Sequence, residues 1–246
     1  MTSTRRRRLG ALYGAAALVV CAGSASAEES PDWTSCVNKG KTYPVAEQIK
    51  GCSNIIQSGR EDARNMAIAF NNRGIAHYGG DDYDKAISDF TEAIRLDPKY
   101  AEAFQSRATA YSDKGDHENA IADYNESIRL KKNNPIAFNN RCDEFLLIHR
   151  VQDALADCNE SLRQRPNHAN TLMHRGNALL AAKQYAKAIA DYDAALRQAP
   201  KDAWALYGRG FAKVKQGDAA SGNADIAAAK EIEPNIVDAF EDRGIK

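Results

Sequence analysis

The chain has 246 residues, 43% of them hydrophobic and 27% charged, and its 33 lysines and arginines balance its 33 aspartates and glutamates. This balance leaves no strong basic field, so neither a nucleic-acid-binding protein nor one held electrostatically on an anionic membrane is expected. The ordinary apolar fraction and the high charge are typical of amphipathic helices with solvated outer faces.

Residues 1–27 have the three-part order of a secretory signal peptide. Residues 5–8 are arginines, 10–22 are mostly apolar or small, and 25–27 form an Ala-Ser-Ala cleavage site. The apolar stretch is too short to span a bilayer, so stable membrane insertion is not expected. Cleavage removes four of the 33 basic residues and no acidic residue, which leaves 29 against 33 and a net charge of −4. We therefore expect a periplasmic or secreted protein cleaved near Ala27, exported by the general or the twin-arginine route.

Residues 28–66 carry two of the four cysteines that remain after cleavage. Spaced apolar residues in this segment are compatible with a helical hairpin: Trp33, Val45, Ile49, Ile55 and Ile56. Cys36 and Cys52 are 16 residues apart, as are Cys142 and Cys158. An even number of cysteines in an exported chain indicates disulfides, and four cysteines allow three pairings. No Cys-x-x-Cys pair is present, so a redox role is not expected.

From residue 67 onward the chain repeats every 34 residues. An arginine recurs six times, at Arg73, Arg107, Arg141, Arg175, Arg209 and Arg243. An aspartate recurs five times, at Asp89, Asp123, Asp157, Asp191 and Asp225. Five full units follow in this register: 67–100, 101–134, 135–168, 169–202 and 203–236. Such a period indicates an array of identical supersecondary units, none of which can bury its apolar face alone.

Within the units, apolar residues spaced by three and four predict helices rather than strands. Glycine–aspartate pairs break two units at their midpoints, and prolines close four of the five. The first unit reads Phe70-x2-Arg73-Gly74-x2-His77, then Ala86-x3-Phe90, Ala93 and Pro98. This pattern resembles the tetratricopeptide repeat, here in an exported protein of bacterial type. The resemblance implies an all-α fold, a right-handed α-solenoid of stacked helix–turn–helix repeats.

The resemblance also assigns the two ends and the cysteines. Residues 28–66 become a degenerate helical hairpin at the N-terminal end. Residues 237–246 start another copy, and we expect a short capping helix that covers the last hairpin. In this register Cys142 and Cys158 lie on facing surfaces of one hairpin, and Cys36 and Cys52 repeat the arrangement, so two disulfides are expected.

The recurring arginines allow two interpretations. Each aspartate lies 16 residues after one arginine and 18 before the next, which predicts a structural ion-pair ladder. The ladder would contain Arg73, Asp89, Arg107, Asp123, Arg141, Asp157, Arg175, Asp191, Arg209, Asp225 and Arg243. Alternatively, the guanidinium groups could grip phosphates of a polyanion. The equal frequency of carboxylates and the negative net charge favour the ladder.

In the family that the chain resembles, the first helices line a concave groove that accepts extended or helical peptides. By register, this groove becomes apolar and aromatic towards the C-terminal end. The candidate binding residues are Asn139, Asp143, Leu146, Leu147, Met173, Asn177, Leu180, Trp204, Tyr207 and Phe211. Aromatic residues are common binding anchors. An alternative, left open, is that Trp204 and Phe211 pack under the capping helix.

The sequence contains no Gly-rich phosphate loop, nucleophile elbow or zinc-binding His-Glu motif, so no catalytic residue, cofactor or metal site is predicted. The resulting hypothesis is a non-catalytic protein–protein interaction module of the cell envelope that binds a peptide or protein segment. The alternatives are a polyanion binder and an accessory subunit of an envelope enzyme complex.

Overall fold

The computed structural model describes residues 30–245, which form thirteen helices and no strand. The predicted signal peptide lies outside the described residues. The helices are α1 (Pro31–Val37), α2 (Val45–Ser58), α3 (Ala63–Gly79), α4 (Tyr83–Leu96), α5 (Ala101–Lys114), α6 (His117–Leu130), α7 (Pro135–Leu147), α8 (Val151–Gln164), α9 (Ala169–Ala181), α10 (Tyr185–Leu196), α11 (Ala203–Lys215), α12 (Ala219–Ile232) and α13 (Ile236–Glu241). None of the helices in this part of the chain combines the length and apolar character needed to cross a bilayer.

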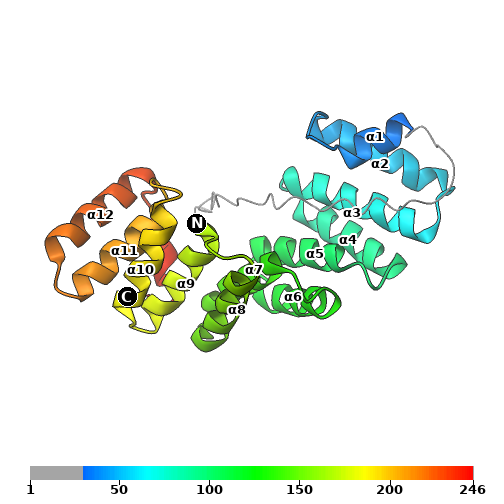
Figure 1. Cartoon of the computed structure of the whole chain (residues 1–246). Coiled ribbons are helices and arrows are strands. Elements are labelled where there is room, and N and C mark those ends of the chain that lie inside the picture. Colours follow the sequence, from blue (N-terminus) through cyan, green and yellow to red (C-terminus); the bar gives the residue numbers. More distant parts are fainter. Residues whose placement is uncertain (1–29, 246) are drawn as a thin grey trace.

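Consecutive helices pack as antiparallel hairpins, from α1–α2 at one end of the array to α11–α12 at the other (Figure 1). The all-α solenoid predicted from the repeat is therefore confirmed. Successive first helices also contact one another directly: α3 with α5, α5 with α7, α7 with α9, and α9 with α11. Successive second helices make no contact of that extent in the described residues. The first helices therefore form the shorter, inner arc of the array, which we call the inner face.

The turn inside each full hairpin uses a left-handed residue at one fixed repeat position. These residues are Asp81, Gly115, His149, Lys183 and Gly217, with φ between 58° and 97°. In three hairpins the next residue is an aspartate that caps the second helix with its side chain. The hairpins that turn at His149 and Lys183 have neither a glycine nor such a cap. A side chain with a Cβ is disfavoured at positive φ, so these two turns depart from the local rule.

Close helix approach depends on small residues that face aromatic rings. The fully buried ring of Tyr192 lies between α9 and α11, against Gly176 and Gly208. A Cβ added at Gly208 would come within 2.3 Å of this ring, and one at Gly176 within 2.7 Å. These two glycines let one tyrosine of α10 pack against both neighbouring first helices.

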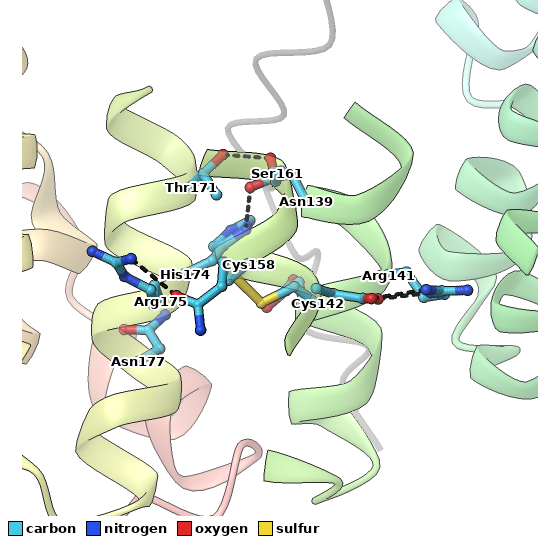
Figure 2. The surroundings of a disulfide bond; sticks show 12 residues. Asn139, Arg141, Cys142, Cys158, Ser161, Thr171, His174, Arg175 and Asn177 are labelled. Atoms are coloured by element: carbon cyan, nitrogen blue, oxygen red, sulfur yellow. Dashed lines mark hydrogen bonds and ion pairs between the residues drawn. A yellow bond between two sulfur atoms is a disulfide. The ribbon is translucent and has the colours of Figure 1, made fainter. Parts of the chain in front are cut away.

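Two disulfides each close one hairpin. Cys36 pairs with Cys52 between α1 and α2, and Cys142 pairs with Cys158 between α7 and α8 (Figure 2). All four cysteines are fully buried. Each bond joins residues 16 apart in sequence, and a loop of that size contributes about 3 kcal/mol in the chain-entropy model.

The last helix does not extend the array. The register predicts a short helix that covers the last hairpin, and α13 packs on α11 of that hairpin, while the chain after α12 returns towards α9 and α10 (Figure 1). We call residues 236–245 the returning segment. Its course brings the segment onto the inner face, where the predicted groove residues lie.

Candidate functional site

The first five arginines of the predicted ladder each pair with an aspartate of their own hairpin. Nε and one Nη of each arginine donate to the two carboxylate oxygens of the aspartate 16 residues later, at 2.6–2.8 Å. The pairs are Arg73–Asp89, Arg107–Asp123, Arg141–Asp157, Arg175–Asp191 and Arg209–Asp225. Such bidentate, charge-assisted bonds are geometrically specific and stronger than neutral ones.

The remaining guanidinium nitrogen of each arginine ties its hairpin to the preceding one. It donates at 2.5–3.3 Å to an oxygen of the previous second helix, at Ser53, Thr91, Asn125, Asn159 or Asp193. The paired aspartate side chains are only 7–13% exposed. Every guanidinium nitrogen in the five pairs is thus engaged within the protein.

The last pair has an additional cation. Lys213 donates to Asp225 at 2.9 Å, beside Arg209. Burial alone would raise the pKa of the Asp225 carboxyl, but the hydrogen bonds from the two cations outweigh it and the pKa lies below its usual value. Two surface hollows, of about 330 and 420 Å³, border ladder arginines Arg209 and Arg175, both already paired with aspartates. The ladder is therefore a frame rather than a row of available cations.

Arg243 keeps the repeat position of the ladder but pairs elsewhere. Its Nε and Nη2 each donate at 3.0 Å to the carboxylate of Asp143, which lies 100 residues earlier on α7. The guanidinium carbon lies 4.5 Å from the ring centroid of Trp204 on α11. Arg243 is only 8% exposed. The predicted membership of Arg243 in the ladder is therefore replaced by a contact across the inner face.

Phe240 is the main apolar anchor of the returning segment. Its ring is 1% exposed, stacks on Trp204 at 5.4 Å between centroids and lies 4.6 Å from the ring of Tyr207. Ile236 and Ile245 are 0% and 4% exposed. These anchors share one apolar cluster with Leu172, Met173, Leu180, Leu206 and Tyr207. The segment is therefore seated in the inner face by burial as well as by charge.

The segment ends in a helix stop that reaches the α7–α8 turn. Gly244 has φ 71°, and the Ile245 N–H donates to the Phe240 carbonyl at 3.1 Å, as in a Schellman motif. A Cβ at Gly244 would lie 3.0 Å from Nδ1 of His149. His149 holds a left-handed turn without glycine, as Asp81 and Lys183 do in other hairpins, and its turn is the place where the segment arrives.

The predicted groove residues fall into distinct environments. Asp143, Trp204 and Tyr207 contact the returning segment directly, and we call these three the anchor site. Met173 and Leu180 belong to the same apolar cluster as Tyr207. Phe211 stacks on Tyr207, and the ammonium group of Lys215 lies over the Phe211 ring. Leu146 packs around the Cys142–Cys158 disulfide, Asn177 accepts a hydrogen bond from the Tyr192 hydroxyl, Asn139 contacts His174, and Leu147 is partly exposed.

His174 on α9 lies beside the anchor site, where Nδ1 is 3.2 Å from Oδ1 of Asn139 (Figure 2). Burial lowers the pKa of His174, and this effect outweighs the nearby Asp143 carboxylate, which raises it. Arg243 lowers the pKa further. The imidazole is therefore neutral at pH 7 and donates to the Asn139 oxygen. Sequence analysis missed the roles of His149, His174, Phe240 and Arg243, because it placed none of them on the inner face.

The N-terminal part of the inner face is polar and internally bonded. The Tyr78 hydroxyl donates to Asp113 at 2.5 Å, linking α3 to α5. Glu144 is 2% exposed, accepts from Ser112 at 2.5 Å and lies 2.8 Å from His117 Nδ1. Within residues 30–245 no three histidine, cysteine or carboxylate side chains are grouped so as to hold a metal ion. The anchor site differs from this polar part of the inner face because it combines aromatic rings with one carboxylate and holds the returning segment.

Comparisons with known proteins agree with this architecture. A family model described as "TPR repeat" matches residues 108–142 and 176–217, and models described as "Tetratricopeptide repeat" match 67–100 and 90–122. No curated protein matches the sequence of the chain.

Several solved structures share the fold. A tetratricopeptide repeat protein from Parabacteroides merdae ATCC 43184 is 17% identical, with a TM-score of 0.66 over 84% of each chain. YrrB, described as a TPR protein with an unusual peptide-binding site, is 18% identical with a TM-score of 0.60, over 77% of this chain and 97% of its own. MamA residues 41 to the end from Desulfovibrio magneticus RS-1 are 19% identical with a TM-score of 0.61, over 69% and 96%. At these identities the likeness concerns the fold alone.

Proposed function

The chain belongs to the tetratricopeptide repeat family, and from this premise we propose that it is a non-catalytic module that binds a helical segment of a partner protein on its inner face. One observation carries the proposal: the C-terminal half of this face already holds a helical segment, α13, whose Ile236 and Phe240 side chains are buried. A surface that seats one amphipathic helix has the shape and apolar character to seat another.

The chemistry of the face supports peptide recognition. Trp204 and Tyr207 provide rigid aromatic surface, and Asp143 provides a single carboxylate that orients a cationic side chain. Aromatic anchors surrounded by apolar contacts are typical of the residues that dominate binding energy. YrrB, a protein of the same fold, is described as having a peptide-binding site. The ladder, with every guanidinium nitrogen engaged, gives the polyanion alternative no comparable support.

We also propose that the module acts outside the cytoplasm, in the periplasm or beyond it. The signal-like residues 1–27 and the two buried disulfides support this location, because structural disulfides persist in oxidising compartments. Mass spectrometry of the chain from an envelope fraction tests it. A chain that keeps residues 1–27 and reduced cysteines in the cytosol contradicts the export proposal.

Site-specific photo-crosslinking tests the binding function. A photoreactive phenylalanine analogue at Leu147, partly exposed at the C-terminal end of the first helix α7, is compared with the same analogue at Ala156, exposed on the second helix α8. We expect a defined protein adduct from envelope extract at Leu147 and none at Ala156. Equal labelling at both positions, or labelling at Ala156 alone, would contradict binding on the inner face. An accessory-subunit role would add stable co-purification of that adduct's protein with an enzyme.

A further inference from the structure

We propose that the returning segment is a resident ligand of the inner face, which a partner protein replaces when it binds. The partner presents a helix end with an aromatic residue, followed three positions later by an arginine and then by a glycine and an aliphatic residue. This inference rests on the proposed binding function and specifies its partner and its regulation. The returning segment has this pattern itself, as Phe240-x-x-Arg243-Gly244-Ile245.

The aromatic residue, the arginine and the glycine of the pattern each meet different residues of the protein, and Ile245 joins the apolar cluster of the inner face. The aromatic ring stacks on Trp204 and Tyr207, and the arginine pairs with Asp143 while covering the Trp204 ring. A ligand that lacked the cation would leave a partly buried carboxylate, 16% exposed, without its bidentate partner. The close approach of Gly244 to His149 and its φ of 71° both disfavour a side chain at that position. The face therefore selects a helix end of defined chemistry rather than any apolar peptide.

The returning segment is suited to leave without unfolding the repeats. It is joined to α12 by exposed residues around Pro234 and Asn235, and its helix α13 has only six residues. Helices this short have no stability of their own in water, so part of the docking energy is lost in ordering the segment. No side chain caps its N-terminus and no basic residue occupies its last turn.

Charge makes the segment an imperfect ligand that a partner can surpass. Glu241 is exposed in the last turn of α13, where a negative charge opposes the helix dipole. A partner helix that keeps the anchors and carries a lysine at this position would bind more tightly. Competition follows from mass action: a segment docked about 99% of the time weakens the apparent affinity of an external ligand about 100-fold.

The test uses a fluorescently labelled peptide of residues 234–246 and the full-length chain, with binding followed by anisotropy. We expect weak binding to the wild type and binding at least about tenfold tighter to Phe240→Ala/Arg243→Ala, whose own segment has lost its anchors. Arg243→Ala alone, which removes no apolar anchor, should be intermediate. A peptide with Glu241→Lys should bind about threefold tighter than the native peptide.

Two controls assign the contact. Adding Asp143→Asn to the double variant should weaken the native peptide but not a peptide carrying Arg243→Ala, so the two changes are coupled. Circular dichroism must show that the double variant melts cooperatively; a second released variant, Phe240→Asp, replaces it if it does not. Equal affinity of wild type and released variants for the native peptide, or no binding to a folded released variant, overturns the proposal.

Two other outcomes are separated by design. A wild-type dimer in sedimentation that disappears in Phe240→Ala would assign the inner face to the segment of a second copy and overturn the partner proposed here. A protein adduct at Leu147 without peptide binding would leave the proposed function standing and refute only the resident ligand. Peptide binding without an adduct at Leu147 would contradict the proposed function and the partner inferred from it, and would support only the docking of the returning segment.

Discussion

Arg209 and Arg243 occupy the same position of successive repeats, yet they stabilise different parts of the molecule. Arg209 pairs with Asp225 within its hairpin and reaches Asp193 of the hairpin before it. Arg243 pairs with Asp143, 100 residues earlier, on the inner face. Both contacts are bidentate and largely buried. The repeat position therefore predicts a partner only inside a helix–turn–helix pair; outside such a pair the side chain binds the carboxylate that the fold brings to it.

The two contacts also act on different equilibria. A ladder pair in the middle of the array is lost only when hairpins separate, which is close to global unfolding. The returning segment can undock while the hairpins stay packed, so its contacts contribute to a local equilibrium. Burial alone does not distinguish these cases, because side chains of both regions are equally covered.

Two phenylalanines with the same exposure, 1%, separate the regions most strongly. Phe90 packs on Gly74 inside α3–α4, so Phe90→Ala should cost about 3–5 kcal/mol of unfolding free energy through a core cavity. Phe240→Ala should cost only about 1–2 kcal/mol, because the loss cannot exceed the docking energy of the segment. Urea denaturation measures both values.

Phe240→Asp is the control for this difference. If undocking limits the loss, aspartate and alanine at position 240 cost the same, although a charge in an intact core would cost far more. A cost for Phe240→Ala as large as that for Phe90→Ala would make the segment an integral part of the folded body.

Substitutions of the ladder arginines should change the unfolding free energy by smaller amounts than the loss of Phe90. Arg141→Leu leaves the Asp157 carboxylate, 9% exposed, without its bidentate partner and should cost about 2–4 kcal/mol. Arg209→Leu should cost less, about 1–2 kcal/mol, because Lys213 still donates to Asp225. Thermal and urea unfolding of these variants gives the order.

Two controls complete the arginine series. Replacing both partners, Arg141→Leu with Asp157→Leu, should recover most of the loss, since no buried charge is left unpaired. Arg243→Leu should change global unfolding by less than about 1 kcal/mol while freeing the anchor site. A loss of partner binding in Arg141→Leu at unchanged stability would show that the ladder has a binding role after all.

The sequence predicts contacts within one 34-residue repeat far better than contacts between distant repeats. The arginine–aspartate step of 16 residues and the equal cysteine spacing place side chains on facing helices of one hairpin, where the structure has them paired. The return of Arg243 to Asp143 crosses three units, and no periodic signal encodes it. The inner-face positions were only partly informative, because Leu146 and Asn177 pack between helices once the curvature of the array is fixed. A local sign of the irregular site was His149, which stands at a turn position held by glycine in two other hairpins, although Asp81 and Lys183 occupy the same position elsewhere.

The smallest expected effect concerns His174, which lies where the two regions meet. Asp143, Arg243 and Asp202 influence its charge, and Asn139 accepts its hydrogen bond. Its folded-state pKa lies below the ordinary value of 6.5, mainly through burial, so the state in which it is exposed binds the proton more tightly. Its contribution to stability is therefore complete above pH 6.5 and declines as the pH falls from there towards the folded-state pKa.

Two measurements show whether protonation of His174 shifts the undocking of the returning segment or the unfolding of the whole array. In a Trp33→Phe background, Trp204 emission reports undocking of the returning segment, and the urea midpoint reports unfolding of the hairpin array. We expect the emission to change between pH 7 and pH 5 while the urea midpoint moves little, because opening the segment already exposes the imidazole. His174→Asn keeps a donor for Asn139 and should flatten the emission profile. A fall of the urea midpoint over the same pH range as the emission change would show that protonation of His174 destabilises the hairpin array itself. The boundary between the array and the returning segment would then lie at the Arg243–Asp143 pair and not at His174.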